Sequence, residues 1–542
     1  MSDSPGAVAG GGVVVTSAGT DLLAARDEAL AADAGITSAI VAKDAAVWGA
    51  DAADLAAERL GWLDCATVSR PLVAEIEALR TELNAAGADH VVLAGMGGSS
   101  LAPEVIAATY GVELTTLDTT DPGQIAGALG DRLASTVLVV SSKSGGTLET
   151  DSHRRAYEDA FRAADIDPAA RIVVVTDPGS PLAAIAADAG YRVFEADPNV
   201  GGRYSALTAF GLVPTGLAGV PIGELLDQAA TMSEALTGDE NPATTLGAAL
   251  GGFGNAGHDK VVIAEAGSGI VGFGDWVEQL IAESTGKNGH GLLPVVVGDT
   301  GSPGFTERDD THLITIGGAP PAPGTSVGGP LGAQFLLWEF ATAVAGKVIG
   351  INPFDQPNVQ ESKDNTASVL DKAGDGPLPE GEPILVDGAI EVHGDGDLFG
   401  GATEITSVID AILRAIPDHG YLAVMAYLDR IHDAAAAALR DALAARTDRA
   451  VTFGWGPRFL HSTGQYHKGG PPLGAFLQIT GVNAFDLEVP GRPFSFGRLQ
   501  LAQALGDSQA INSRSRPFVR LHLTDRAAGI DQLLTAAIGS RR

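Results

Sequence analysis

A short run of hydroxyls and glycines follows an apolar stretch near residue 140. Residues 137–141 are apolar enough for a buried strand, and the loop after them carries Ser142, Lys143, Ser144 and Thr147. Backbone N–H groups and hydroxyls in such a loop bind anions, and a helix beginning near Thr147 adds positive potential at its amino end. Lys143 adds a full charge. The stretch predicts an anion site, although a solvated turn that caps a helix has the same composition.

A second loop of this kind covers residues 95–100, with the sequence Gly-Met-Gly-Gly-Ser-Ser. A glycine-rich loop after a strand also occurs in dinucleotide-binding proteins. Here the third glycine of that fingerprint is replaced by Ser100, and Asp118 is the nearest acid that could contact a ribose. Two hydroxyl loops in one sheet therefore favour a single phosphorylated sugar over a nicotinamide dinucleotide.

One acid and one arginine have spacings that suit proton transfer. Glu283 ends a predicted helix that starts at Trp276, and Gln279 lies one turn earlier on the same face. A buried carboxylate at that position could shuttle a proton, whereas a terminal glutamate on a solvated face would have no role. Arg203 follows Gly201 and Gly202, where crowded backbone is relieved. The alternative is a turn with an exposed arginine.

The positions of these residues are set by the predicted strands and helices, which appear in the sequence as short apolar runs alternating with helical patterns. We expect strands over residues 90–94, 114–118, 137–141, 171–176, 191–195, 260–265, 292–297, 312–316, 383–386, 421–426, 450–454, 475–480 and 518–523. Repeated strand–helix–strand units predict an α/β fold with parallel sheets flanked by helices, and ligands in such sheets bind at the carboxyl ends of strands.

The same patterns suggest three parts of the chain. We expect a small-residue leader over residues 1–50, a first α/β domain over 51–235 and a second over 236–542 with a carboxy-terminal extension. Residues 320–330 are rich in glycine and proline and predict a connector, and residues 430–446 predict an alanine-rich helix. Whether the last third completes the second sheet or forms its own domain stays open.

Composition limits the partners. The 542 residues include 34 Lys and Arg against 67 Asp and Glu, a formal charge of -33, which disfavours nucleic acid and anionic membranes. Cys65 is the only cysteine, so the chain has no intrachain disulfide and no cysteine metal cage. No secretion signal or run of about eighteen apolar residues is evident. We expect a cytoplasmic protein.

Five motifs in this order resemble the phosphoglucose isomerases. They are Gly95-Met96-Gly97-Gly98-Ser99, Ser142-Lys143-Ser144 through Thr147-Leu148-Glu149-Thr150, Gly201-Gly202-Arg203-Tyr204-Ser205, Gln279 through Glu283-Ser284-Thr285-Gly286-Lys287, and Leu331-Gly332-Ala333 to Phe354-Asp355-Gln356-Pro357-Asn358-Val359. The resemblance implies two doubly wound sugar-isomerase (SIS-type) domains. It also implies a homodimer that interconverts glucose 6-phosphate and fructose 6-phosphate without metal or nucleotide.

The resemblance also implies roles for individual residues. Glu283 matches the base that moves a proton between C1 and C2, Arg203 the residue that steadies the enediolate, and Lys363 a lysine used in ring opening. The remaining matches contact the substrate: Ser99, Ser142, Lys143, Ser144 and Thr147 at the phosphate, and Gly98 and Gln279 elsewhere. The family's glycine and glutamate after the Gln-Pro pair are Asn358 and Gln360 here, which makes the register of this helix less secure.

The ring-opening histidine is displaced. Bacterial family members carry a Leu-His-Ser-x-Gly-Gln string soon after the base, and here that string begins at Leu460. We therefore expect His461 to open the sugar ring, with His290 and His467 as alternatives. Residues 421–480 also resemble the isomerase half of bifunctional transaldolase/phosphoglucose isomerases, and the roughly fifty residues ahead of the first domain are too few for a transaldolase barrel.

Two other functions fit the same residues. One is a related isomerase that also accepts mannose 6-phosphate or another acidic hexose. The other is a non-catalytic sugar-phosphate sensor with the same double fold, against which Glu283 and Arg203 argue because a sensor needs neither.

Overall fold

The computed structural model describes residues 6–238 and 240–539. Contacts group the chain into two compact units. The first takes in the described residues up to Asp118, residues 131–300 and residues 305–356. The second takes in residues 119–130, 301–304 and the described residues from Pro357 onward.

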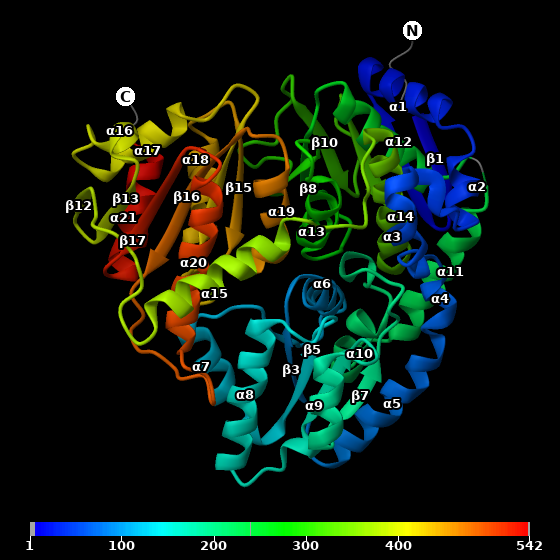
Figure 1. Cartoon of the computed structure of the whole chain (residues 1–542). Helices are drawn as coiled ribbons and strands as arrows, with labels where there is room; N and C mark the ends of the chain where they lie inside the picture. Colours follow the sequence, from blue (N-terminus) through cyan, green and yellow to red (C-terminus); the bar gives the residue numbers. More distant parts are fainter. Residues whose placement is uncertain (1–5, 239, 540–542) are drawn as a thin grey trace. The chain divides into compact units, whose positions relative to one another are not determined.

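A five-stranded parallel sheet forms one half of the first unit. Its strand order is β4 (Thr115–Leu117), β3 (His90–Gly95), β5 (Thr136–Ser141), β6 (Ile172–Thr176) and β7 (Arg192–Glu195). Helices α8 (Leu148–Ala163), α9 (Pro181–Ala189) and α10 (Ala209–Ala218) pack on these strands (Figure 1). Every residue of β3, β5 and β6 is buried, as parallel sheets covered by helices require.

The second sheet of this unit combines strands from the start of the chain with strands from residues 260–328. Its order is β1 (Gly6–Gly10), β2 (Val13–Ala18), β11 (Gly324–Gly328), β10 (Thr311–Ile316), β8 (Lys260–Glu265) and β9 (Leu293–Asp299). Strands β8 to β11 are parallel, and β1 and β2 run antiparallel to their neighbours. Helices α12 (Pro242–Asn255) and α13 (Phe273–Thr285) contact these strands, and α14 (Leu331–Ile349) packs on both of those helices.

Other helices complete the first unit: α1 (Thr20–Ala32), α2 (Ile36–Val41), α3 (Ala50–Ala57), α4 (Cys65–Val68), α5 (Arg70–Ala85), α6 (Leu101–Thr109) and α11 (Ile222–Ala235). One continuous hydrophobic core runs through this unit, and α14 contributes sixteen consecutive buried residues to it, from Leu331 to Gly346.

The second unit has a sheet and a core of its own. The strand order is β12 (Leu385–Asp387), β13 (Ile390–Gly394), β17 (Phe518–Leu523), β16 (Gly474–Gly481), β14 (Tyr421–Ala426) and β15 (Ala450–Trp455). Its helices are α7 (Pro122–Gly130), α15 (Val359–Ala373), α16 (Gly396–Phe399), α17 (Ile405–Arg414), α18 (Leu439–Ala444), α19 (Gly464–Gly469), α20 (Phe496–Asn512) and α21 (Arg526–Ile538). The last third therefore forms its own sheet, which answers the question that the sequence left open.

The predicted α/β class with mostly parallel sheets is confirmed, and two local predictions are wrong. The connector expected over residues 320–330 contains β11, because Thr325, Ser326 and Val327 are buried between β10 and β2. The helix expected over residues 430–446 is reduced to a 3₁₀ turn (Ala434–Ala438) and α18. The Asp429 carboxylate accepts hydrogen bonds from the backbone of Ile431 and His432 and holds a turn where the helix was expected to begin.

The division into residues 1–50, 51–235 and 236–542 stays a prediction. Residues 6–18, which lie inside the expected leader, supply the two antiparallel strands of the second sheet, with Val13 and Val15 buried.

Candidate active site

The two hydroxyl loops begin at adjacent points of the first sheet. Strands β3 and β5 pair directly, and Gly95 lies opposite Ser141, so the loops that follow leave the same edge side by side. Ser142 Oγ lies 3.0 Å from Thr147 Oγ1. Thr147 occupies the N-cap position of α8 without a side-chain capping bond, and α8 begins at Leu148, as expected. The positive end of α8 therefore faces the loop that carries these hydroxyls.

The serines of these loops differ in exposure. Ser99 and Ser142 are buried, whereas Ser144 is exposed and its Oγ accepts a hydrogen bond from the backbone of Gly146 at 3.3 Å. Together with Thr147, these serines give four short hydroxyl side chains near one helix end, a composition suited to a phosphate group.

Lys143 is held by an ion pair in this structure. Its Nζ lies 2.6 Å from Asp177 Oδ2. Partial burial lowers the pKa of Lys143, and burial raises the pKa of Asp177. The loop thus carries a balanced pair of charges beside the hydroxyls rather than an isolated cation.

Two glycines bring the first loop against the turn that holds Arg203. A Cβ atom on Gly98 would lie 2.0 Å from the carbonyl oxygen of Gly202, far inside van der Waals contact. Only a residue without a side chain permits this approach. The 3₁₀ turn Gly202–Tyr204 therefore packs directly on the 3₁₀ turn Gly97–Ser99.

Arg203 is buried and fixed by five hydrogen bonds. They run from its two terminal nitrogens to Ser284 Oγ at 3.1 Å, to the carbonyls of Pro353, Phe354 and Asp355 at 3.3, 2.9 and 3.3 Å, and to Gln356 Oε1 at 2.8 Å. Its Nε makes no hydrogen bond within the described part of the chain and lies 3.8 Å from Glu283 Oε2. The guanidinium is thereby oriented toward the carboxylate.

Glu283 lies in the last turn of α13 and is 6% exposed. Gln279 Nε2 donates a hydrogen bond to Glu283 Oε2 at 3.2 Å from one turn earlier, on the shared face that the sequence predicted. Burial excludes the two alternatives of a solvated glutamate and an exposed arginine. The structure thus joins Glu283, Gln279 and Arg203 into one buried group.

A second cation, for which the sequence predicts no role, lies near this group. Lys287 is fully buried, and its Nζ lies 2.6 Å from Asp355 Oδ1 and 2.8 Å from the carbonyl of Asn352. Burial, together with the nearby charge of Arg203, lowers its pKa to about 8. Lys287 and Asp355 lie in two of the motifs named above. Only the structure shows that residues 352–356 bind both Lys287 and Arg203.

The remaining two predicted catalytic residues belong to the second unit. Lys363 is exposed on α15, and His461 is half-buried at the end of a 3₁₀ turn (Arg458–His461). Of the two alternative histidines, His290 is exposed in the first unit. His467 is buried against the rings of Tyr421, Phe459 and Phe476, with no hydrogen bond to its ring nitrogens in the residues described.

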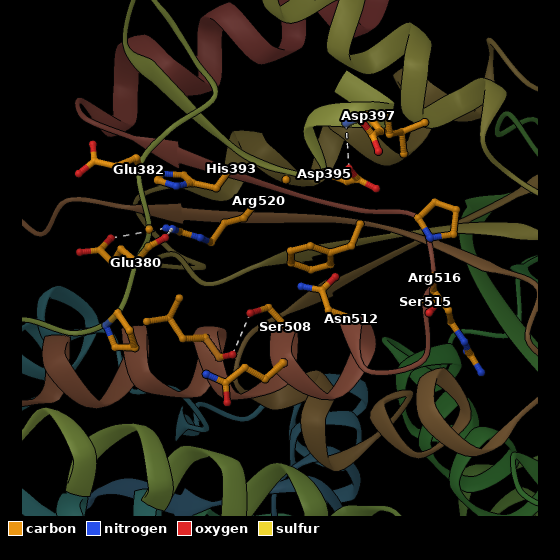
Figure 2. A pocket seen from close by; sticks show the side chains of 18 residues that line it. Glu380, Glu382, His393, Asp395, Asp397, Ser508, Asn512, Ser515, Arg516 and Arg520 are labelled. Carbon is orange, nitrogen blue, oxygen red and sulfur yellow. Dashed lines mark hydrogen bonds and ion pairs between the residues drawn. The ribbon is translucent and has the colours of Figure 1, made fainter. Parts of the chain in front are cut away.

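The second unit also contains a cavity of about 930 Å³, shown in Figure 2. Buried Arg520 and partly buried His393 line it together with carboxylates of residues 380–397 and polar side chains near the end of α20. Arg520 donates a hydrogen bond to the carbonyl of Glu380 at 2.7 Å. None of the predicted site residues lines this cavity, which lies by the first residues of β17 and the last of β13.

One group of side chains in the described residues has the composition of a metal site. His90, Glu113 and Asp131 lie close together, but both carboxylates already contact Arg132. The ring nitrogens of His90 lie 3.1 Å from the hydroxyls of Thr136 and Thr115. Each member of the group is therefore occupied by other partners.

Residues 78–291 match the phosphoglucose isomerase family. They include both hydroxyl loops, Arg203, Gln279 and Glu283. The matched residues make up less than half of the chain.

Curated relatives of this segment carry the corresponding name. A glucose-6-phosphate isomerase of Cyanothece sp. is 36% identical over 211 residues, which are 36% of this chain and 40% of that protein. A probable glucose-6-phosphate isomerase of Haloarcula marismortui is 33% identical over 39% of this chain and 49% of that protein. The chloroplastic glucose-6-phosphate isomerase 1 of Arabidopsis thaliana is 30% identical over 52% and 57%. The chain spans about half or less of the length of these relatives.

Solved structures share the fold at lower identity. A glucose-6-phosphate isomerase from Chlamydia trachomatis aligns over 68% of this chain and 90% of its own, with a TM-score of 0.54 and 20% identity. A hypothetical protein from Thermus thermophilus aligns over 64% and 94%, with a TM-score of 0.53 and 23% identity. In the part of the chain described here, no helix is both long and apolar enough to cross a membrane.

Proposed function

We propose that the chain is an aldose–ketose isomerase that interconverts glucose 6-phosphate and fructose 6-phosphate. One observation carries the proposal: a buried carboxylate, Glu283, lies 3.8 Å from a buried guanidinium that five hydrogen bonds hold in place. The match of residues 78–291 to the phosphoglucose isomerase family and the names of the relatives support it.

The proposed reaction begins with the phosphate in the hydroxyl cradle. Ser99, Ser142, Ser144 and Thr147 bind its oxygens and hold the unreactive end of the sugar, so that C1 and C2 lie at a fixed distance from the anchor. Gly98 and Gln279 contact the substrate, and Lys143 with Asp177 keeps the loop in shape. Anchoring at the phosphate limits the movement of the open chain before proton transfer.

Proton transfer then takes place at Glu283. The carboxylate removes the proton from C2 of the open-chain aldose and returns it to C1 through an enediolate. The C2 hydroxyl becomes the ketose carbonyl, and its proton passes to the C1 oxygen, which becomes a hydroxyl. Arg203 stabilises the negative charge of the enediolate, because its position is set before the reaction and needs no reorganisation. Before this step, His461 and Lys363 open the sugar ring.

The location and the assembly are part of the same proposal. The resemblance to the family implies a homodimer. The single cysteine, which is free and buried, fits a reducing compartment and supports a cytoplasmic location. Light scattering on the purified chain measures the assembly.

The decisive experiment is a coupled assay for product formation from glucose 6-phosphate, fructose 6-phosphate and mannose 6-phosphate. Glu283→Gln keeps the size of the side chain and its contact with Gln279 but cannot accept the proton, so turnover should fall about 10²- to 10⁴-fold. Binding of 6-phosphogluconate should be retained.

Glu278→Gln changes a half-buried carboxyl on the same helix and serves as the control, with turnover close to wild type. A Glu283→Gln enzyme that binds the inhibitor and keeps more than a few per cent of wild-type turnover would refute the base assignment. A wild-type chain that binds sugar phosphates but turns none over would support the sensor alternative.

A further inference from the structure

Two amides join the segments that carry Lys363 and His461. Asn358, just before α15, donates its backbone N–H to Gln465 Oε1 at 2.9 Å. In return, Gln465 Nε2 donates to Asn358 Oδ1 at 2.9 Å from the first turn of α19. The bonds are reciprocal, so breaking either side chain removes at least one of the two.

This pair is one side of a closed ring of polar contacts. Glu361, on the first turn of α15, accepts two hydrogen bonds from Arg514, at 2.8 and 2.7 Å. Arg514 Nε in turn donates to the carbonyl of Lys468 in α19 at 3.1 Å. The hydrogen bonds and the charge of Arg514 hold the pKa of Glu361 below its usual range. Helices α15 and α19 are thus connected twice, at Asn358–Gln465 and through Glu361–Arg514.

A buried ion pair anchors the α19 side of the ring. Lys468 Nζ lies 2.9 Å from the carboxylate of Asp507 on α20, and both side chains are almost fully buried. The same ammonium donates to the carbonyl of Gly464 at 3.0 Å. Because α20 also packs along α15, the ring rests on a fixed base.

The position of Lys363 depends on these contacts more than the position of a buried residue would. Its side chain is exposed and forms no hydrogen bond or ion pair with the residues described. The position of its ammonium therefore depends on the position of α15. The Asn358 that holds α15 stands where the family pattern has glycine, and its partner Gln465 lies in the displaced string of His461.

We infer that Asn358 and Gln465 are positioning residues, which hold α15 and the His461 segment in the arrangement that ring opening requires. The inference rests on the proposed isomerase function and deepens it. The two departures from the family pattern thus act together: the glycine-to-asparagine change supplies the bond that fixes the relocated histidine segment. A shift of about 1 Å between reacting groups can cost roughly 10²-fold in rate.

The test compares a substrate that must be opened with one that is always open. Fructose 6-phosphate closes its ring through the C5 hydroxyl, so 5-deoxyfructose 6-phosphate remains an open-chain ketose. Gln465→Met keeps the length of the side chain and removes both amide bonds. It should lower kcat/KM for fructose 6-phosphate about 10- to 100-fold. For the 5-deoxy ketose, followed by proton NMR exchange in D₂O, the change should stay within about twofold.

Asn358→Gly restores the family residue and keeps the backbone bond to Gln465, so it should show a smaller selective loss. Gln532→Met is the matched control. Gln532, on α21 of the same unit, also uses its amide for one donated and one accepted hydrogen bond: it donates to the carbonyl of Asp387 at 3.0 Å and accepts from Ala389 N–H at 3.1 Å. Gln532→Met should leave unchanged the ratio of the activity on fructose 6-phosphate to the activity on the 5-deoxy ketose, whatever its effect on the thermal midpoint.

The outcomes separate the inference from the function. Equal loss on both substrates in Gln465→Met, or the same selectivity in Gln532→Met, shows a merely structural role and overturns the inference while the isomerase proposal stands. A wild-type chain inactive on both substrates refutes the isomerase proposal and the inference with it. Selective loss in Gln465→Met, matched by selective loss in His461→Ala, supports both.

Discussion

Arg203 shows how a single side chain is prepared for anionic chemistry. Three backbone carbonyls and a glutamine oxygen balance its charge without a permanent carboxylate bond, so the guanidinium stays available to a developing negative charge. Lys287, which binds the same segment, is satisfied by Asp355 instead. Residues 352–356 therefore bind two cations in different ways: Lys287 pairs with a carboxylate, whereas Arg203 donates to carbonyl and amide oxygens.

The buried histidine His467 makes a residue-scale prediction about pH. Burial among aromatic rings lowers its pKa well below the ordinary value of 6.5. Below pH 6.5 the unfolded chain therefore binds a proton that the folded chain refuses, and stability falls as the pH falls. Relative to His467→Phe, the unfolding free energy of the wild type should fall by up to about 1.4 kcal/mol per pH unit as the pH falls below 6, measured by urea unfolding.

His419→Asn is the control for this prediction. His419 is exposed with a positive φ of 54°, a conformation that asparagine tolerates. Its replacement should leave the pH slope as in wild type. Parallel slopes for wild type and His467→Phe would contradict the assignment of a neutral, buried imidazole.

At the scale of elements, the loops that follow β3 and β5 could be predicted from the sequence. The contact between Gly98 and Gly202, which brings the Arg203 turn to the first loop, could not. Apolar strands followed by glycine and hydroxyl loops identified both loops, because adjacent parallel strands end at one edge. Glu283 and Gln279 shared a helix face at four-residue spacing. Arg203 is 80 residues away from Glu283, and no local pattern indicates that Gly98 packs on Gly202.

The missed elements have a physical explanation. β11 lies in a stretch of glycine, proline, threonine and serine, whose strand conformation comes from pairing with β10 and β2 rather than from propensity. Ser17 Oγ and Thr325 Oγ1 lie 3.2 Å apart in that pairing, and His312 Nε2 lies 3.0 Å from the same Thr325 hydroxyl. Such hydroxyl contacts give no hydrophobic periodicity for a sequence pattern to detect.

The contact between Gly98 and Gly202 makes an element-scale prediction. In Gly98→Ala, the new methyl group meets the Gly202 carbonyl, so the turn with Arg203 must shift. Turnover should fall by about 10²-fold or more, because Arg203 loses its alignment with the substrate. Gly202→Ala is the matched control, since a Cβ atom there has no neighbour within 4 Å and should change turnover less than about threefold. Similar activities of the two variants would argue against this contact as the element that aligns Arg203.

At the scale of the whole molecule, the charge of -33 predicts a salt dependence. Mutual repulsion of carboxylates destabilises the compact state, and salt screens it. The thermal midpoint should rise by several degrees with NaCl, mostly between about 0.01 and 0.1 M, where the Debye length falls from about 30 to 10 Å. Calorimetry over a salt series measures this. A midpoint that is flat in that range and rises only near 1 M would indicate solute exclusion instead of screening.

The pairing of β2 with β11 has a consequence for how the chain is made. Strand β2 ends at Ala18, and its partner β11 begins at Gly324. At a synthesis rate of about 5–20 residues per second, β2 leaves the ribosome about 15–60 s before the strand that receives it. During that interval the edge of β2 that later pairs with β11 has no partner strand, and Val13 and Val15, which are buried in the folded protein, lie on that strand. An unpaired strand edge is a site for pairing with other chains, so the nascent chain is most prone to aggregation before β11 is made.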